Sequence, residues 1–463
     1  MLKKMTRRGA LHMVSSQLGG LAFAALVADI ARADDRKDSQ QDNPLAPKSP
    51  HFAARAKHVI FLSMRGAPSH VDTFDHKPQL TRDSGRPSRF GGGKLFGSPW
   101  KFAPRGQSGL QISELFPRVA RHADELCLLR GMHCDQPNHP QATTQTHTGS
   151  FQFVRPSLGA WTLYGLGTDN TDLPGFIVLN PSGGSNNFGS AFLPAVYQGT
   201  KIGGGGRFAR GGSAASQRIP NISNPRLDDR AQRIQLDFVQ QLNRNKLRRD
   251  HQQPQVEGMI QSFELAFRMQ STMPALMDMS QETAATQKLY GIGNQETDGF
   301  GKQCLLARRM VESGVRFVEL TSNGWDHHTN LRDSLENSCR SIDQPIAGLL
   351  ADLKQRDLLK DTLVIWAGEF GRTPHGQNGD GRDHNNKGYT TWMAGGGVKG
   401  GFSYGATDEY GYEAVEGRMH IHDWHATILH VLGLDHERLT YRHAGRDFRL
   451  TDVHGNVAKD ILA

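Results

Sequence analysis

Short apolar runs that end in clusters of polar side chains are the feature that most constrains the fold of this chain. In the segment DTLVIWAGEFGRTPHGQNGDGRDHNN, residues 362–366 form a continuous β-rich apolar run between Asp361 and Gly368. Such a run is typical of a parallel strand that is covered on both faces. Ligands of open α/β sheets bind beyond the carboxyl ends of the strands, so Glu369 and the polar loop at 372–386 form a candidate site.

Other segments repeat this pattern and alternate with helical periodicity. Further strands are expected at 58–64, 126–129, 174–179 and 315–322, and helices at 113–123, 304–314 and 334–356. Apolar residues at spacings of three and four over 227–290 predict an inserted helical segment. The alternation of strand and helix predicts an α/β fold with a mostly parallel central sheet.

The N-terminus predicts export. Arg7 and Arg8 precede an apolar run at 18–27, and Ala31-Arg32-Ala33 has the small-x-small pattern of a cleavage site. Residues 1–33 are therefore interpreted as a twin-arginine signal, with the twin-arginine export machinery as a partner and a periplasmic or extracellular destination. The alternative is an amphipathic N-terminal helix of a cytosolic protein. Residues 34–55 are polar and predict a disordered linker before a folded domain at 56–463.

Composition excludes several classes of protein. No segment reaches the roughly 18 apolar residues that a spanning helix needs, so no stable membrane anchor is expected. Four cysteines without a Cys-x-x-Cys spacing do not make a disulfide framework. The formal net charge is +8, but the basic cluster at 244–249 lacks interleaved aromatic residues. It predicts a solvated helix face, and no nucleic-acid partner is expected.

Four loops that follow predicted strands carry side chains of the kinds that bind metals. Imidazoles and carboxylates together suit divalent ions, and two ions about 4 Å apart can hold the attacking and leaving oxygens of a displacement. Two ions are therefore expected, without a choice among Zn, Mn, Ca and Mg. For each residue the alternative is a helix cap or a structural histidine. The candidate ligands are Asp72, Asp326, His327, His328, Glu369, Asp383 and His384.

Candidate catalytic groups accompany these ligands. Thr143 and Thr144, in NHPQATTQTHTGS, could act as a nucleophile once a metal lowers the pKa of a hydroxyl, although a helix start explains them equally well. Arg155, Arg372 and Arg382 could each bind a tetrahedral anion, and Arg372 and Arg382 are the expected catalytic pair. Surface salt bridges are the alternative role of these arginines.

Two further patterns predict structure rather than chemistry. The glycines at 395–397 lack the spacing of a phosphate-binding loop and predict a tight turn. In HIHDWHATILHVLGL, Asp423 is the expected N-cap of a late helix, and His425 is expected to be packed or exposed rather than metal-bound.

Several motifs resemble a known superfamily. DTLVIWAGEFG, GWDHHTN, RDHNNKGYTTWMAGGGVKGG and HDWHATILHVLGLD resemble segments of the sulfatase and alkaline phosphatase superfamily. RPSLGAWTLYGLG, FGKQCLLARRMVESGVRFVEL, GEFGRTP and LTYRHAGRDFRLTDVHG resemble the twin-arginine-exported bacterial family called domain of unknown function 1501. The resemblance implies an alkaline phosphatase-like, three-layer α/β/α sandwich.

The resemblance also implies how the candidate ligands are divided between two metals. The chain departs from the superfamily pattern at several positions. Asp326 with His328 and His384 look like the ligands of one metal, Glu369 looks like an acid of the second, and His327 could replace His328. Arg65 stands where the first strand of the superfamily ends in a metal-binding Asp, so Asp72 or Asp75 would have to substitute. Phe370 replaces the usual His or Asn, and the Cys/Ser-x-Pro-x-Arg motif is absent. A formylglycine-type sulfatase is therefore disfavoured.

These observations favour an exported, metal-dependent hydrolase of phosphate or sulfate esters. Its substrate would be a small-molecule or polysaccharide ester. The alternative is a catalytically degenerate fold that serves as a secreted binding or assembly protein. A polysaccharide-binding module is a third alternative, which rests on the polar segment at 180–212.

Overall fold

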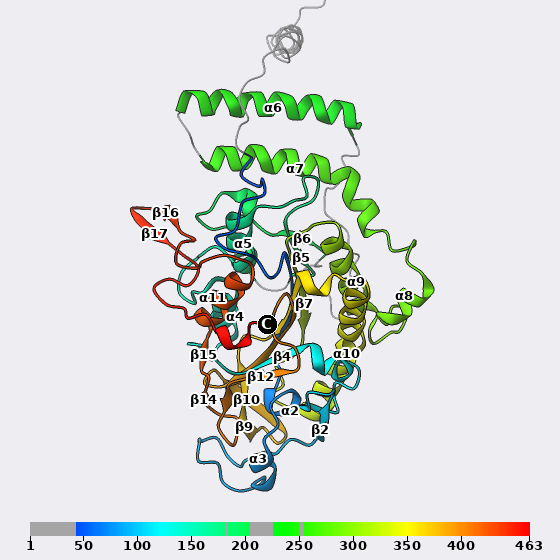
Figure 1. Ribbon diagram of the computed structural model, residues 1–463, viewed down its shortest axis with the longest axis vertical. Helices are drawn as coiled ribbons and strands as arrows, with labels where there is room; N and C mark the ends of the chain where they lie inside the picture. The colour runs from blue at the N-terminus through cyan, green and yellow to red at the C-terminus, as the bar shows by residue number, and fades with distance from the viewer. Residues whose placement is uncertain (1–42, 182–183, 204–225, 251–253) are drawn as a thin grey trace, which may run out of the picture. The chain divides into compact units, whose positions relative to one another are not determined.

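The structure of the protein is a computed structural model that describes residues 43–181, 184–203, 226–250 and 254–463 (Figure 1). The fold described below is that of the compact unit Pro44–Ala463. The predicted signal at 1–33 and residues 34–42 of the predicted linker lie outside the described residues. Residues 44–55, predicted to belong to a disordered linker, instead pack on the domain: Leu45 is buried, and the backbone N–H groups of Lys48 and Arg55 donate to the Leu166 and Val431 carbonyls at 2.9 and 2.8 Å. Across the described ranges, we find no helix with the length and apolar character that crossing a membrane requires.

Within the described residues, nine strands form the central sheet, in the order β12-β4-β11-β8-β1-β7-β5-β6 with β15 beside β4. Strand β11 runs antiparallel to β8 and β4, and the other pairings are parallel. The predicted α/β class with a mostly parallel sheet is therefore confirmed. The strands are β1 (His58–Arg65), β4 (Leu126–His133), β5 (Phe176–Leu179), β6 (Thr200–Ile202), β7 (Phe317–Asn323), β8 (Thr362–Ala367), β11 (Tyr389–Gly395), β12 (Phe402–Tyr404) and β15 (Met419–His420).

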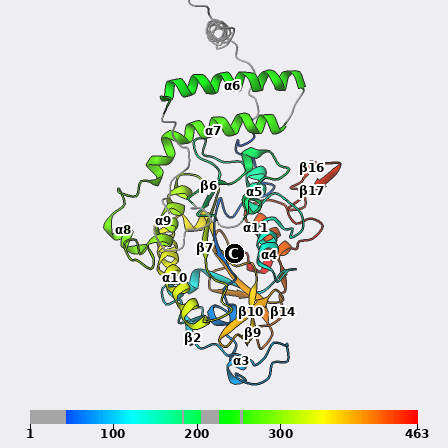
Figure 2. The same cartoon turned by 180° about the vertical axis from the view of Figure 1, so that it is seen from behind.

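Helices cover both faces of this sheet. In Figures 1 and 2, α9 (Asp298–Glu312) and α10 (Leu331–Gln355) lie on one face, and α4 (His139–Thr148), α5 (Leu158–Leu166) and α11 (Ile421–Val431) lie on the other. The arrangement gives three layers, as expected. The region predicted to be helical at 227–290 contains α6 (Asp229–Asp250), α7 (Pro254–Met277) and α8 (Ala284–Leu289).

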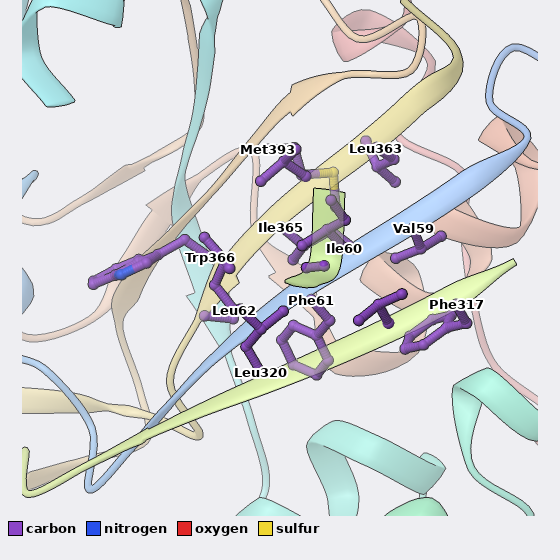
Figure 3. Close-up of a cluster of buried hydrophobic side chains, with 14 of the residues drawn as sticks. Val59, Ile60, Phe61, Leu62, Phe317, Leu320, Leu363, Ile365, Trp366 and Met393 are labelled. Carbon is purple, nitrogen blue, oxygen red and sulfur yellow. The ribbon is translucent and has the colours of Figure 1, made fainter. Parts of the chain in front are cut away.

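The core explains why the central strands read as unbroken apolar runs. Strand β1 pairs with β7 on one side and β8 on the other, and Val59, Ile60 and Leu62 are fully buried. Figure 3 shows the side chains of these strands packed together with Met393 of β11. Each such side chain contributes about 1.5–3 kcal/mol by leaving water, so a polar residue inside β1 or β8 would be costly.

The structure corrects three local predictions. Residues 113–123 are not one helix: strand β3 (Leu110–Ser113) ends where the helix was expected to begin, Pro117 interrupts the segment, and a 3₁₀ helix, η1 (Val119–Glu125), follows. The predicted loop at 372–386 contains a hairpin of β9 (Gly371–Gln377) and β10 (Gly381–Asn385). Asn378 and Gly379 turn this hairpin with positive φ angles of 50° and 97°, and Asn-Gly is a strong hairpin signal that the sequence reading overlooked.

The third correction concerns α11. His420 is its N-cap, and Asp423, the expected cap, instead accepts a hydrogen bond from the His420 backbone N–H at 2.9 Å in a capping box. His425 is fully buried, as expected. The three glycines at 395–397 all have positive φ, which confirms the tight turn.

The polar segment at 180–212 has regular structure in its described part, including β6 and two 3₁₀ turns. The remaining elements are α2 (His70–Thr73), α3 (Pro78–Arg82), β2 (Phe102–Arg105), β3 (Leu110–Ser113), η1 (Val119–Glu125), η2 (Ser185–Phe188), η3 (Ala195–Tyr197), η4 (Leu359–Asp361), β13 (Ala406–Thr407), β14 (Ala414–Glu416), β16 (Tyr441–His443), β17 (Arg446–Phe448) and η5 (Lys459–Ile461).

Candidate metal centre

Four polar side chains meet beyond the carboxyl ends of β1, β7 and β8. Asp326 and His328 follow β7, His384 lies on β10, and His139 is the first residue of α4. Gly66, directly after β1, makes this meeting possible. Its φ is +109°, and a Cβ there would lie 2.6 Å from the backbone N of Asp326, so a residue with a side chain would push the β7 loop away.

One carboxylate oxygen is the centre of the group. Asp326 Oδ1 lies 2.9 Å from His328 Nε2, 3.1 Å from His139 Nε2 and 3.3 Å from His384 Nε2. The Nε2 atoms of His328 and His384 are themselves 2.9 Å apart. All four possible ligand atoms lie within 4.8 Å of one another, and the described residues contain this one such group of three or more.

In each of the three histidine rings, the nitrogen that is not near Asp326, Nδ1, lies close to an oxygen atom. His139 Nδ1 lies 2.5 Å from Glu369 Oε1, His328 Nδ1 lies 2.5 Å from Gln377 Oε1, and His384 Nδ1 lies 2.6 Å from the Pro137 carbonyl oxygen. Because these oxygens only accept hydrogen bonds, each Nδ1 donates its proton to one of them, and Nε2 is the nitrogen whose lone pair can bind a metal. Three lone pairs and a carboxylate therefore converge, and a metal cation is the group that fits this donor set.

Two buried side chains support the ligands. Glu369 receives the Gly66 backbone N–H at 3.0 Å and holds His139 through Nδ1. Arg372, 1% exposed, donates to Asp326 Oδ1 at 2.7 Å and to the Ala67 carbonyl at 2.9 Å. Burial acts to raise the pKa of Asp326, but the hydrogen bond and charge of Arg372 outweigh it and hold that pKa far below its usual range. Asp326 is thus kept ionised.

Two of the sequence-predicted residues pair with each other instead of joining the group. Arg382 donates to Asp72 through Nε (2.7 Å) and Nη2 (3.0 Å), and both side chains are fully buried. The third nitrogen of Arg382 donates to the Thr373 carbonyl at 3.1 Å, and Ser69 donates to Asp72 at 2.5 Å. The structure therefore places Asp72 and Arg382 in a structural ion pair outside the four ligands.

The other candidate ligands lie beside the centre. The ring of His327 is buried, its Nε2 is 3.5 Å from Ser338 Oγ, and burial lowers its pKa to about 4. Asp383 Oδ1 lies 3.8 Å from His328 Nδ1, on the outer side of that ring. Asp75, the proposed substitute for the missing first-strand acid, accepts from Thr407 and pairs with Lys77 at 3.1 Å. None of these three belongs to the four-residue group.

The two threonines differ in their surroundings. Thr144 is half-buried and donates to the Pro140 carbonyl within α4 at 2.8 Å. Thr143 is 6% exposed, and its hydroxyl has no hydrogen-bond partner among the described residues. Thr143 is also four residues after His139, so the two side chains share one face of the helix.

His139 is the ligand that the sequence reading did not assign. It lies 187 positions before Asp326 in the chain, and the hydroxyl groups are the feature of its segment that suggested chemistry. A signal was present: Pro140 in the first turn of a helix after a β-strand marks a helix start, and helix starts after strands lie at the ligand edge of the sheet.

The model of the family described as "Protein of unknown function (DUF1501)" matches residues 56–462. No curated protein matches the chain.

Similar solved structures include the PsFucS1 sulfatase from Pseudoalteromonas sp., with 14% identity over 83% of this chain and 69% of that chain and a TM-score of 0.37. The lipoteichoic acid synthase LtaP from Listeria monocytogenes has 9% identity over 88% and 78%, with a TM-score of 0.38. The phosphonate monoester hydrolase SpPMH from Silicibacter pomeroyi has 10% identity over 81% and 73%, with a TM-score of 0.36. Identities and TM-scores this low say nothing about what this chain binds or converts.

Proposed function

Because the chain belongs to the DUF1501 family of proteins of unknown function, its activity has to be inferred from the site, and we propose that it is a metal-dependent hydrolase of phosphate or sulfate esters. The observation that carries this proposal is the convergence of three imidazole lone pairs and one carboxylate at the carboxyl edge of a mostly parallel sheet.

The donor set favours a particular kind of metal. Three nitrogens and one oxygen suit Zn²⁺ and similar transition metals, whereas Ca²⁺ and Mg²⁺ prefer oxygen ligands. We therefore propose one such ion, held by His139, Asp326, His328 and His384. The second ion that the sequence suggested stays a prediction, since Glu369 is engaged by Gly66 and His139.

The chain's own groups would orient and assist the reaction. When bound, a divalent ion supplies Lewis acidity that polarises an ester oxygen and makes water or a hydroxyl more acidic. Arg372 keeps Asp326 in place, and its donors are committed to Asp326 and to backbone carbonyls, so it acts as a positioning residue. Glu369 fixes the orientation of His139. Thr143 offers a buried hydroxyl one helical turn from His139, which makes it the better nucleophile candidate of the two threonines.

A structural ion in a binding or assembly protein is the second candidate. Four protein ligands around one ion are typical of structural zinc sites, whereas catalytic sites usually keep one position open. The four-residue group therefore supports this alternative as well, and turnover has to decide between the two.

The test compares metal content and turnover in protein purified without chelator. The variants are Asp326→Ala, His384→Ala and, as a control at a neighbouring acid outside the group, Asp383→Asn. About one equivalent of a transition metal in the wild type and in Asp383→Asn, and its loss from the other two, would support the site. Parallel loss of phosphate or sulfate ester hydrolysis would support the enzyme. Bound metal without hydrolysis of any ester in a broad panel would favour the structural ion, and wild-type protein without metal would refute the proposal.

A further inference from the structure

A separate cavity of about 200 Å³ lies where α4 ends. Its walls come from the segment after α4 at 148–156, the turn at 448–454, and the side chains of Asp135, Trp161, Phe192 and His422. Gly149 lets the first two walls approach each other. Its φ is +74°, and a Cβ there would lie 2.3 Å from the Leu450 carbonyl oxygen. The cavity therefore depends on a glycine at this helix end.

One guanidinium faces this cavity without an acidic partner. Arg155 packs on aromatic rings, 4.3 Å from the centre of Phe448 and 5.3 Å from the centre of Phe153. Asp452 also lines the cavity, and its charge favours the ionised form of Arg155, but its ion pair is with Arg446. Across the described part of the chain, no carboxylate comes within 4.0 Å of the Arg155 guanidinium. The other arginine of the lining, Arg449, pairs with Glu437 at 3.0 Å. A partly buried, unpaired guanidinium is a receptor for a carboxylate, sulfate or phosphate group.

The rest of the lining suits a hydroxylated ring. Asp135 offers a carboxylate that Gln145 and His420 orient. His422 is 7% exposed, and its buried Nδ1 has no hydrogen-bond partner in the part of the chain that the structure describes. Phe153 at the rim is 59% exposed. Acceptors for hydroxyls, a free imidazole nitrogen and an exposed aromatic face are the groups with which proteins hold sugar rings in polar pockets.

The cavity and the metal centre lie at the two ends of one helix. His139 begins α4 and belongs to the metal centre, and Thr148 ends α4 and lines the cavity. Nine residues separate them, which is about 14 Å along the helix axis. The loop before α4 also joins the two sites, since Asp135 lines the cavity and the Pro137 carbonyl accepts from His384. A small monoester bound at the metal centre is shorter than this separation.

We propose that this cavity is a substrate subsite that binds an anionic sugar unit of an oligosaccharide whose scissile ester lies at the metal centre. This inference rests on the proposed function and adds the substrate class to it. Arg155 binds the anionic group, Phe153 covers the sugar ring, and Asp135 and His422 take its hydroxyls. The substrate is therefore an extended, acidic or sulfated oligosaccharide ester.

The test uses the metal-loaded wild type, Arg155→Gln and a control, Arg121→Gln, which removes the same charge from an exposed residue on η1 at the opposite end of β4. Binding of three hexasaccharides is measured by calorimetry: one sulfated, one built of uronic acids and one neutral. Turnover of p-nitrophenyl phosphate and p-nitrophenyl sulfate is measured beside it, because these small esters reach only the metal centre.

Arg155→Gln is expected to bind the sulfated or the uronic hexasaccharide about 10–100-fold more weakly, as expected for loss of charge-assisted hydrogen bonds. Its turnover of the small esters should not change, and Arg121→Gln should match the wild type in both assays. The anionic hexasaccharide whose affinity falls more in Arg155→Gln identifies the anionic group that the cavity binds.

Three results would overturn the subsite. They are wild-type binding of none of the three hexasaccharides, equal binding of the neutral and anionic ones, and unchanged affinity in Arg155→Gln. A wild type that hydrolyses no ester would refute the proposed function, but the binding comparison would still decide whether the cavity recognises an anionic sugar.

Discussion

The sequence suggested that Asp72 is a metal ligand and Arg382 a catalytic residue, whereas the structure pairs them in a buried ion pair. Substitution of Arg382 tests which role is correct. Both side chains are fully buried, and each nitrogen of Arg382 is hydrogen-bonded. Arg382→Met would leave the Asp72 carboxylate in the interior with Ser69 as its remaining side-chain partner. Removing one partner of a buried ion pair costs about 3–5 kcal/mol, because the other charge is left uncompensated.

The assay is unfolding in urea of the wild type, Arg382→Met, and the double variant Asp72→Leu/Arg382→Met. The single variant should lose about 3–5 kcal/mol of unfolding free energy. The double variant should recover most of that loss, because apolar side chains replace both charges and no buried carboxylate stays unpaired. Metal content should equal that of the wild type in both variants, since neither residue belongs to the four-ligand group.

Two outcomes would refute this reasoning. The first is Arg382→Met with wild-type stability and abolished ester hydrolysis, which would return Arg382 to the catalytic role that the sequence suggested. The second is a loss of metal from the double variant while its fold is intact, which would make Asp72 a ligand.

Three further variants test other parts of the structure. Glu369→Gln should weaken metal binding about 10–100-fold in a chelator competition, because the charge that orients His139 is lost; unchanged affinity would contradict the supporting role. Gly66→Ala should lower both stability and metal affinity, with about 1–3 kcal/mol from strain alone, because its Cβ would strike the backbone of Asp326; a wild-type urea midpoint would contradict it. Burial raises the pKa of the Asp343 carboxyl to about 6, against the hydrogen bonds that it accepts. The fold therefore favours the protonated carboxyl, so the contribution of Asp343 to the free energy of unfolding is complete below pH about 4 and declines by about 3 kcal/mol as the pH rises through 6. Asp343→Asn should remove this decline between pH 4 and pH 8 in urea unfolding, and an identical decline in the variant would assign it to another group.

Local patterns in the sequence determined the architecture. The runs at 58–64, 315–322 and 362–366 predicted β1, β7 and β8, because a strand buried on both faces has to be apolar at every position. The hairpin of β9 and β10 was also encoded locally, in Asn378-Gly379, although the surrounding polar residues and glycines suggested a loop.

The position of polar residues after strands likewise pointed to the edge of the sheet where Asp326, His328 and His384 meet. This much follows from the sequence, since the carboxyl ends of parallel strands share one edge. A shared edge of the sheet does not determine which of its polar side chains are in contact.

Only the tertiary structure decided which of these polar residues share a site. Arg382 and Asp72 are separated by 310 positions and form an ion pair, while His139 enters the group from the start of a helix on another part of the chain. Such contacts depend on the register of β1 between β7 and β8 and on the close approach that Gly66 permits. A sequence lists the charges and lone pairs, but the distances that make them ligands or ion-pair partners arise only when distant strands pack together.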